Sequence, residues 1–111
     1  MKRAALVLLW VLGSAAAAAA LTADEQMRFA DGIYLRGFYE TAVTEYLALL
    51  RDHPDSEHVP AALYRTGECY RQMGTPTGAE RFYKQLATQH PQSDQVPRAE
   101  LRRAELALVD D

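Results

Sequence analysis

The sequence repeats itself at a spacing of 37 residues. Gly37 recurs as Gly74, and 13 of the 53 positions compared between residues 22–74 and 59–111 are identical. An average composition would give roughly four identities by chance. The shared residues fall at turns and at apolar positions, where a repeated structure would constrain the chain. The chain is therefore predicted to be built from stacked copies of one structural unit.

The spacing of apolar residues predicts that each unit is a pair of α-helices. Five helices are expected, over residues 23–36, 38–52, 59–74, 76–89 and 97–109. Thr22 and Glu25 have the spacing of a capping box at the first of them. Thr75 is expected to be the N-cap of the fourth, with Pro76 at its first position. No alternating run is long enough for a strand, so the fold class is predicted to be all-α.

The third of these helices is the most informative one. Its apolar or small residues wrap more than half of its circumference, from Ala62 through Met73. A helix that is apolar on two sides must lie between neighbours. We therefore expect the helix over residues 59–74 to be the middle of the stack.

The first twenty residues have the composition of a secretory signal peptide. Lys2 and Arg3 precede nine apolar residues over 4–12, and the alanines of residues 15–20 supply small-residue cleavage sites. The apolar run is short for a membrane span. Residues 1–20 are thus expected to be a signal peptide that is cut after Ala20, which leaves no transmembrane span in the mature chain.

Composition excludes several classes of protein. The formal charge of −3 offers no basic surface for nucleic acid. The hydrophobic content of 49% fits a globular chain of one domain. Cys69 is the only cysteine, so no internal disulfide is possible, and no cysteine follows the apolar run to act as a bacterial lipidation site.

The residues at turns and helix contacts resemble the tetratricopeptide repeat. In that motif a small residue and an aromatic precede a turn glycine, and an alanine, an aromatic and a closing proline follow it. The corresponding residues are Ala30, Ile33, Gly37, Tyr39, Ala42, Tyr46 and Pro54, and then Gly67, Tyr70, Gly74, Ala79, Tyr83 and Pro91. The resemblance implies an α-solenoid of helix hairpins over residues 21–111, with units 23–59, 60–96 and a partial unit 97–111.

The sequence departs from the usual tetratricopeptide repeat in two ways. The period is 37 rather than the usual 34, because the linkers after His53 and His90 are long, and Pro76 replaces an expected aromatic. The long linker and the phrase at residues 67–70 look like a bacterial envelope subgroup. That subgroup includes the repeat domain of the Tol-Pal system coordinator and the repeat lipoprotein of the outer-membrane assembly machinery. It implies a periplasmic location after export across the inner membrane.

The resemblance also implies a concave groove, lined by the first helix of each unit, in which a protein partner binds. Carried over by position, its residues are Met27, Asp31, Tyr34, Leu35, Tyr64, Glu68, Arg71, Gln72, Leu101 and Glu105, followed by Leu108 and Val109. Arg28, Arg65 and Arg102 recur beside the acids and could pair with them. The alternative is a solvated charged face, since charge rows on helices are often only that.

Few residues suggest catalysis or metal binding. His53 and His90 occupy equivalent turns, and His58 has Glu57 beside it but no third ligand in view. Cys69 is expected to be a buried structural thiol. The acid row of Asp31, Glu68 and Glu105 is the only basis for an enzyme of the glycosidase type, and a shallow groove would not raise a carboxyl pKa. No catalytic residue, metal or cofactor is expected.

Two functions follow from these observations. The first is a non-enzymatic adaptor that binds a segment of another envelope protein in the groove. The second is a structural assembly subunit that self-associates or docks onto a larger envelope complex. The partial unit 97–111 and its apolar residues favour a chain that is truncated or associates with itself, because solenoids need polar caps.

Overall fold

The computed structural model describes residues 20–109, so the predicted signal peptide at residues 1–20 lies almost entirely outside the described residues. The described part of the chain forms five helices: α2 (Ala23–Leu35), α3 (Tyr39–Asp52), α4 (Val59–Gln72), α5 (Pro76–Gln89) and α6 (Val96–Val109). No residue from 20 to 109 is in a strand. The all-α prediction is confirmed, and every helix end lies within two residues of its expected position.

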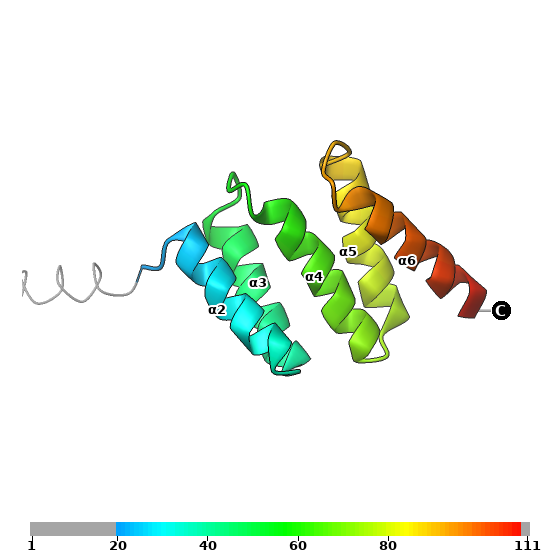
Figure 1. The fold of residues 1–111 in the computed structure, drawn as a ribbon, viewed down its shortest axis with the longest axis horizontal. Helices are drawn as coiled ribbons and strands as arrows, with labels where there is room; N and C mark the ends of the chain where they lie inside the picture. Colours follow the sequence, from blue (N-terminus) through cyan, green and yellow to red (C-terminus); the bar gives the residue numbers. More distant parts are fainter. Residues whose placement is uncertain (1–19, 110–111) are drawn as a thin grey trace, which may run out of the picture.

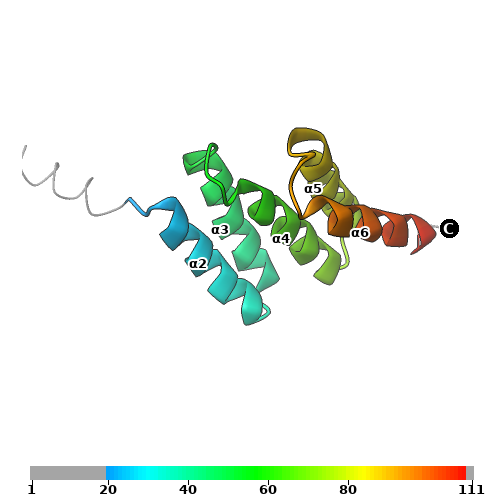
Figure 2. The ribbon, with the colours of Figure 1, turned by 45° about the horizontal axis from the view of Figure 1, so that its top comes forward.

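The helices form a row in which each one packs on its neighbours in sequence (Figures 1 and 2). α2 pairs with α3 and α4 pairs with α5, while α3 contacts α4 and α5 contacts α6. α4 lies between α3 and α5, as its two apolar sides predicted. The architecture is a helical solenoid of the tetratricopeptide kind.

The two hairpin turns close in the same way, 37 residues apart. Gly37 and Gly74 adopt φ of 82° and 74°, in the left-handed region that favours glycine. The N–H of Gly37 donates to Tyr34 O at 2.9 Å, and that of Gly74 donates to Arg71 O at 3.1 Å. The turn glycines thus end α2 and α4 and return the chain along the preceding helix.

Both expected N-cap residues occupy the predicted positions, and one of them makes the capping hydrogen bonds. The Glu25 N–H donates to Thr22 Oγ1 at 3.1 Å and the Thr22 N–H donates to Glu25 Oε1 at 3.0 Å, which completes the capping box. Thr75 is the N-cap residue of α5, as predicted, but its side chain makes no capping hydrogen bond. Thr75 has ψ of 80°, whereas Thr22 has the extended ψ of 164° that aims a hydroxyl at the first turn. Pro76 does begin α5, as expected.

The core follows the repeat. Ala42, Tyr46 and Leu49 on α3 are fully buried, and so are their counterparts Ala79, Tyr83 and Leu86 on α5. These side chains fill the space against the first helix of each hairpin. Each second helix therefore contributes the pattern Ala-x3-Tyr-x2-Leu to the core.

The packing of α4 depends on a glycine at its contact with α5, and it buries the cysteine of the chain. A Cβ on Gly67 would lie 2.5 Å from the ring of Tyr83, so α4 and α5 approach closely only because this residue is glycine. Next to it, Cys69 is fully buried, and burial raises the pKa of its thiol to about 12, with a further contribution from the charge of Glu68. The thiol stays protonated and is structural.

None of the described helices is both long and apolar enough to span a membrane.

Candidate functional site

Hydrogen bonds between polar side chains link each hairpin to the helix that follows it. Asp31 on α2 accepts a hydrogen bond from the Tyr46 hydroxyl of α3 at 2.6 Å. Nη1 of Arg65, from α4, donates to the two oxygens of the same carboxylate at 2.7 and 2.8 Å. One acid is thus held by a tyrosine of its own hairpin and by an arginine of the next. We call this arrangement the acid–Tyr–Arg unit.

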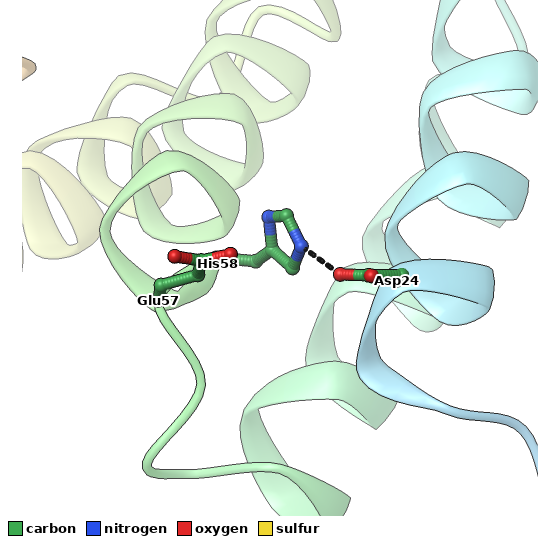
Figure 3. Close-up of side chains that lie close together, drawn as sticks. All are labelled: Asp24, Glu57 and His58. Atoms are coloured by element: carbon green, nitrogen blue, oxygen red, sulfur yellow. Dashed lines mark hydrogen bonds and ion pairs between the residues drawn. The ribbon is translucent and has the colours of Figure 1, made fainter.

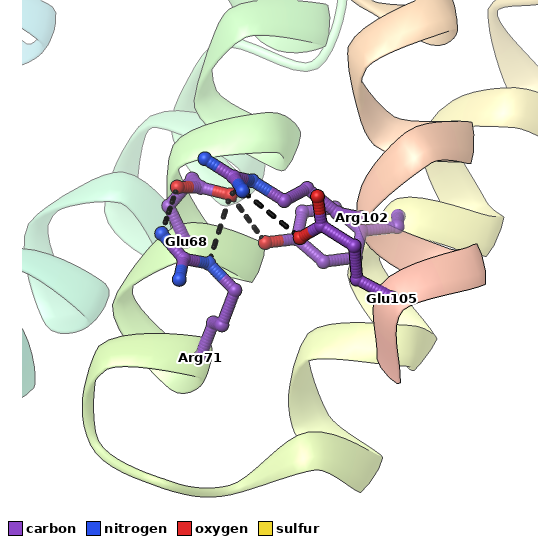
Figure 4. Close-up of polar contacts among 5 residues, drawn as sticks. Glu68, Arg71, Arg102 and Glu105 are labelled. Carbon is purple, nitrogen blue, oxygen red and sulfur yellow. Dashed lines mark hydrogen bonds and ion pairs between the residues drawn. The ribbon is translucent and has the colours of Figure 1, made fainter. Parts of the chain in front are cut away.

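The unit recurs 37 residues later around Glu68 (Figure 4). Glu68 accepts from the Tyr83 hydroxyl at 2.5 Å and from Arg102 Nε of α6 at 3.1 Å. It also accepts from Arg71 Nη2 at 2.8 Å, and Arg102 in turn donates to Glu105 at 3.0 Å. The expected pairing of the arginine series with the acids is therefore present for Arg65 and Arg102.

Glu68 is ionised despite its burial. Glu68 is only 5% exposed, and burial alone would raise the pKa of its carboxyl group. Hydrogen bonds from Arg71 and Tyr83 and the charge of Arg102 outweigh that effect, so the pKa lies below its usual value. In glycosidase chemistry the general acid needs a raised pKa, and the nucleophile or base needs a carboxylate oxygen that is free to react. The geometry of Asp31 and Glu68 is instead that of structural ion pairs.

An open cavity of about 470 Å³ lies beside these two units. Its walls come from the first helices α2, α4 and α6, and its lining residues are Asp31, Tyr34, Leu35, Tyr64, Arg65, Glu68, Arg98 and Arg102. We call it the first-helix groove. The sequence predicted that first helices share a groove, and this cavity is built from them.

Two side chains in the first-helix groove are available to a partner. Leu35 is 82% exposed at the end of α2. The guanidinium of Arg98 lies over the Tyr64 ring, 5.7 Å from its centroid, and Arg98 makes no hydrogen bond or ion pair with the rest of residues 20–109. By contrast, Arg65 and Arg102 are engaged by acids. The groove thus combines apolar surface with one guanidinium that no carboxylate of the described residues holds.

The ten predicted groove residues divide into two sets. The first-helix groove is lined by Asp31, Tyr34, Leu35, Tyr64 and Glu68. The remaining five do not line it: Met27, Arg71, Gln72, Leu101 and Glu105.

Burial or hydrogen bonding explains why three of the ten residues offer little groove surface. Met27 is 4% exposed and belongs to the hydrophobic core, since α2 turns this side chain toward its neighbours rather than toward the groove. Tyr64 is only 6% exposed, so its ring supports Arg98 more than it offers surface of its own. Arg71 is held by Glu68. Arg98 was missed because its counterpart one period earlier is Ala61, and the repeat gave no indication of it.

Besides Glu57, His58 has a second carboxylate neighbour, Asp24, which the sequence did not predict. Asp24 contacts His58 Nε2 through Oδ1 at 2.5 Å, and Glu57 lies beside them (Figure 3). Asp24 is 34 residues away and meets His58 because the start of α4 lies close to the start of α2. Both carboxylates are exposed and lie at helix N-termini, where the positive end of the helix dipole disfavours a cation. We interpret the contact as a second link between the hairpins.

The comparison with known families bears on the second hairpin. Residues 61–93 match the family model described as Tetratricopeptide repeat. This segment is therefore similar to a tetratricopeptide repeat. The matched segment covers most of α4, all of α5 and the turn after it, and no curated protein matches the chain significantly. Tetratricopeptide repeats stack into solenoids whose concave faces bind other proteins, so the expected class of partner is a protein.

The lowered pKa of Glu68 predicts how stability depends on pH. The unfolded glutamate titrates near pH 4.3, and the folded one titrates lower, so the unfolded chain binds more protons between these values. The stabilisation is complete above the unfolded pKa and is lost as pH falls through the folded pKa. Glu68→Gln should lower the free energy of unfolding by about 1–3 kcal/mol at pH 7, and the difference from the parent should shrink in acid.

Urea titrations from pH 7 to pH 3 measure this effect. Glu40→Gln is the matched control, because its side chain is exposed and makes no ion pair with other described residues. A Glu68→Gln variant whose deficit is as large at pH 3 as at pH 7 would show that the charge of Glu68 is not what stabilises the fold.

Proposed function

We propose that the chain is a non-enzymatic adaptor that binds a segment of another protein in the first-helix groove. The observation that carries the proposal is that exposed Leu35 and the Arg98 guanidinium line the same groove, and that no carboxylate of residues 20–109 holds this guanidinium. Tyr34 is half-buried beside them and adds aromatic surface, and aromatic and arginine side chains are the commonest anchors of protein interfaces. A partner with an apolar side chain and a carboxylate would match this surface.

The proposed location is the bacterial periplasm, and the partner is another envelope protein. The support is the sequence alone: the basic and apolar N-terminal residues of a signal peptide, and the likeness of the linkers to envelope repeat proteins. The class of function does not depend on the location.

The test uses two groove variants that leave the core intact. Leu35→Ala and Arg98→Glu change exposed side chains, so helix content should stay unchanged. Capture of a partner from periplasmic extract should fall about tenfold, which corresponds to about 1.4 kcal/mol of binding free energy. Arg81→Glu is the control, because Arg81 stacks on Phe82 at 5.8 Å in a matching cation–π pair outside the groove. Equal capture by the groove variants and the control would contradict the adaptor proposal.

The second candidate function is a structural assembly subunit, which the C-terminal helix favours. Leu101, Leu108 and Val109 on α6 are 58%, 77% and 79% exposed. In this case sedimentation at micromolar concentration should show association of the chain with itself, and the groove variants should leave that association unchanged. A compact monomer of residues 21–111 would contradict self-association.

A further inference from the structure

A second cavity, of about 510 Å³, lies between the first halves of α2 and α4. We call it the α2–α4 cavity. Two of its lining residues, Asp31 and Arg65, also line the first-helix groove. The two cavities therefore meet at these residues, which are joined by an ion pair of 2.7 Å. The other charged or ionisable residues of its lining are Asp24, Arg28, Glu57 and His58.

The α2–α4 cavity and the first-helix groove lie end to end. α2 and α4 run in the same direction (Figure 1). On α2, the lining of the α2–α4 cavity extends from Asp24 to Asp31, and that of the groove extends from Asp31 to Leu35. The order on α4 is the same, since Ala61 lines only the α2–α4 cavity and Glu68 lines only the groove. The two cavities thus form one channel along both helices.

The two ends of this channel differ in charge. At the α2–α4 end, Asp24 and Glu57 are exposed. Within residues 20–109 the Glu57 carboxylate makes no hydrogen bond or ion pair, and the Asp24 carboxylate bonds only to His58 (Figure 3). One ligand atom from each of these three side chains lies within 4.8 Å of the other two, so a single cationic group can reach both carboxylates. At the groove end, the available charge is the Arg98 guanidinium.

The negative charge at the α2–α4 end is reduced but not cancelled. Each helix N-terminus has about half a positive charge, whereas Asp24 and Glu57 each carry a full negative one. Arg28 also lines this end, and Glu25, one turn earlier on α2, supplies a counter-charge to it. The remaining negative charge attracts a lysine or arginine of a segment that is already bound in the groove, because tethering raises the local concentration of that side chain.

We propose that the partner segment carries opposite charges at its two ends, and that these charges fix its orientation in the channel. A carboxylate of the segment pairs with Arg98 and an apolar side chain contacts Leu35. A lysine or arginine at its other end lies between Asp24 and Glu57. The occupant is a segment of another protein. This inference rests on the adaptor function proposed above and adds the chemistry of the partner.

The dimensions of the channel set the spacing of the two charges. α2 rises about 16 Å from Asp24 to Leu35, and α4 rises about 10 Å over the length from Glu57 to Tyr64, whose ring lies under Arg98. An extended chain rises about 3.3 Å per residue. The basic and acidic residues of an extended segment should therefore be about three to five residues apart.

The probe is the synthetic peptide Lys-Ser-Ala-Leu-Glu with an acetyl and an amide cap, so that its only charges are the two side chains. Amide NMR spectra of the isotope-labelled chain are followed up to millimolar peptide. We expect saturable binding that Glu57→Lys weakens by about threefold to tenfold and Arg98→Glu by about tenfold. Glu40→Lys is the matched control, because Glu40 is an exposed glutamate that lines neither cavity.

A second peptide isolates the basic end. It has glutamine in place of the lysine, and it should bind the parent chain about threefold to tenfold more weakly. Its affinity should not change with Glu57→Lys, as a double-mutant cycle requires when the lysine contacts Glu57 directly. A third peptide, with glutamate in place of the lysine, should bind the Glu57→Lys variant better than it binds the parent.

Three results would overturn the proposal. The first is no binding of the Lys-Ser-Ala-Leu-Glu peptide, and the second is equal affinity of the Glu57→Lys and Glu40→Lys variants for it. The third is a loss of affinity from Glu57→Lys that is the same for the lysine and glutamine peptides. If only Arg98→Glu weakens binding, this proposal fails and the adaptor proposal stands. The adaptor proposal itself fails if Leu35→Ala and Arg98→Glu leave capture from extract unchanged, so the two failures are distinguishable.

Discussion

The Tyr83→Ala variant is expected to lose about 4 kcal/mol of unfolding free energy, the range that large-to-small aromatic changes cost in a core. Tyr83 is fully buried, packs on Gly67 and pairs with the Tyr64 ring at a centroid distance of 5.9 Å. Its removal leaves a cavity and takes a hydrogen bond from the ionised Glu68. Small domains are stable by only about 5–15 kcal/mol, so urea denaturation should show a much earlier midpoint.

Two conservative variants separate packing from hydrogen bonding. Tyr83→Phe keeps the ring and removes the hydroxyl, so it should cost about 1–3 kcal/mol. Tyr70→Phe removes a hydroxyl that makes no hydrogen bond within the described residues, and its ring still stacks on Phe82 at 5.6 Å. It should change stability by less than about 0.5 kcal/mol. Equal costs for the two phenylalanine variants would mean that the Tyr83–Glu68 bond contributes nothing.

Alanine at Gly67 and alanine at Gly32 are expected to have opposite effects. A Cβ at Gly67 would meet the Tyr83 ring at 2.5 Å, so α4 and α5 must separate, and overpacking of this kind costs about 1–3 kcal/mol. A Cβ at Gly32 would have no neighbour within 4 Å. Gly32→Ala should therefore stabilise the chain by about 0.5–1 kcal/mol, the usual gain for removing a glycine from a helix interior.

Thermal and urea unfolding of the two variants measure the contrast. The first hairpin carries Ala30 where the second carries Gly67, so α2 and α3 already accommodate the methyl group that α4 and α5 exclude. If Gly67→Ala were as stable as Gly32→Ala, the close approach of α4 and α5 would not limit the packing of this hairpin.

The period and the turn residues were sufficient to predict the fold. A chain that places glycine at residues 37 and 74 has two positions where it can turn back, and the apolar spacing between them allows only helices. Contacts within one hairpin follow from such local patterns. The position of the Thr75 cap was predictable, whereas its missing side-chain hydrogen bond was not, because that bond depends on a ψ angle set by the turn as a whole.

The site was less predictable, because its contacts cross between hairpins. The arginine series could be placed beside the acids, since both recur with the period. The hydroxyl bonds of Tyr46 and Tyr83 could not be foreseen, because the sequence does not show how far a buried ring reaches across its hairpin. Met27 was placed in the groove by position alone, although the rotation of α2 turns it into the core. Arg98 has no arginine at the equivalent position one period earlier, so the comparison between repeat units did not identify it.

The central claim is that a partner segment lies in the first-helix groove, and site-specific photo-crosslinking tests it most directly. A photoreactive residue is placed at Leu35, in the groove, and separately at Leu47, which is 38% exposed on α3 and does not line the groove. We predict that position 35 crosslinks to a single partner and position 47 does not, and that Arg98→Glu abolishes the crosslink. A partner crosslinked from position 47, or from position 35 regardless of Arg98, would contradict the claim.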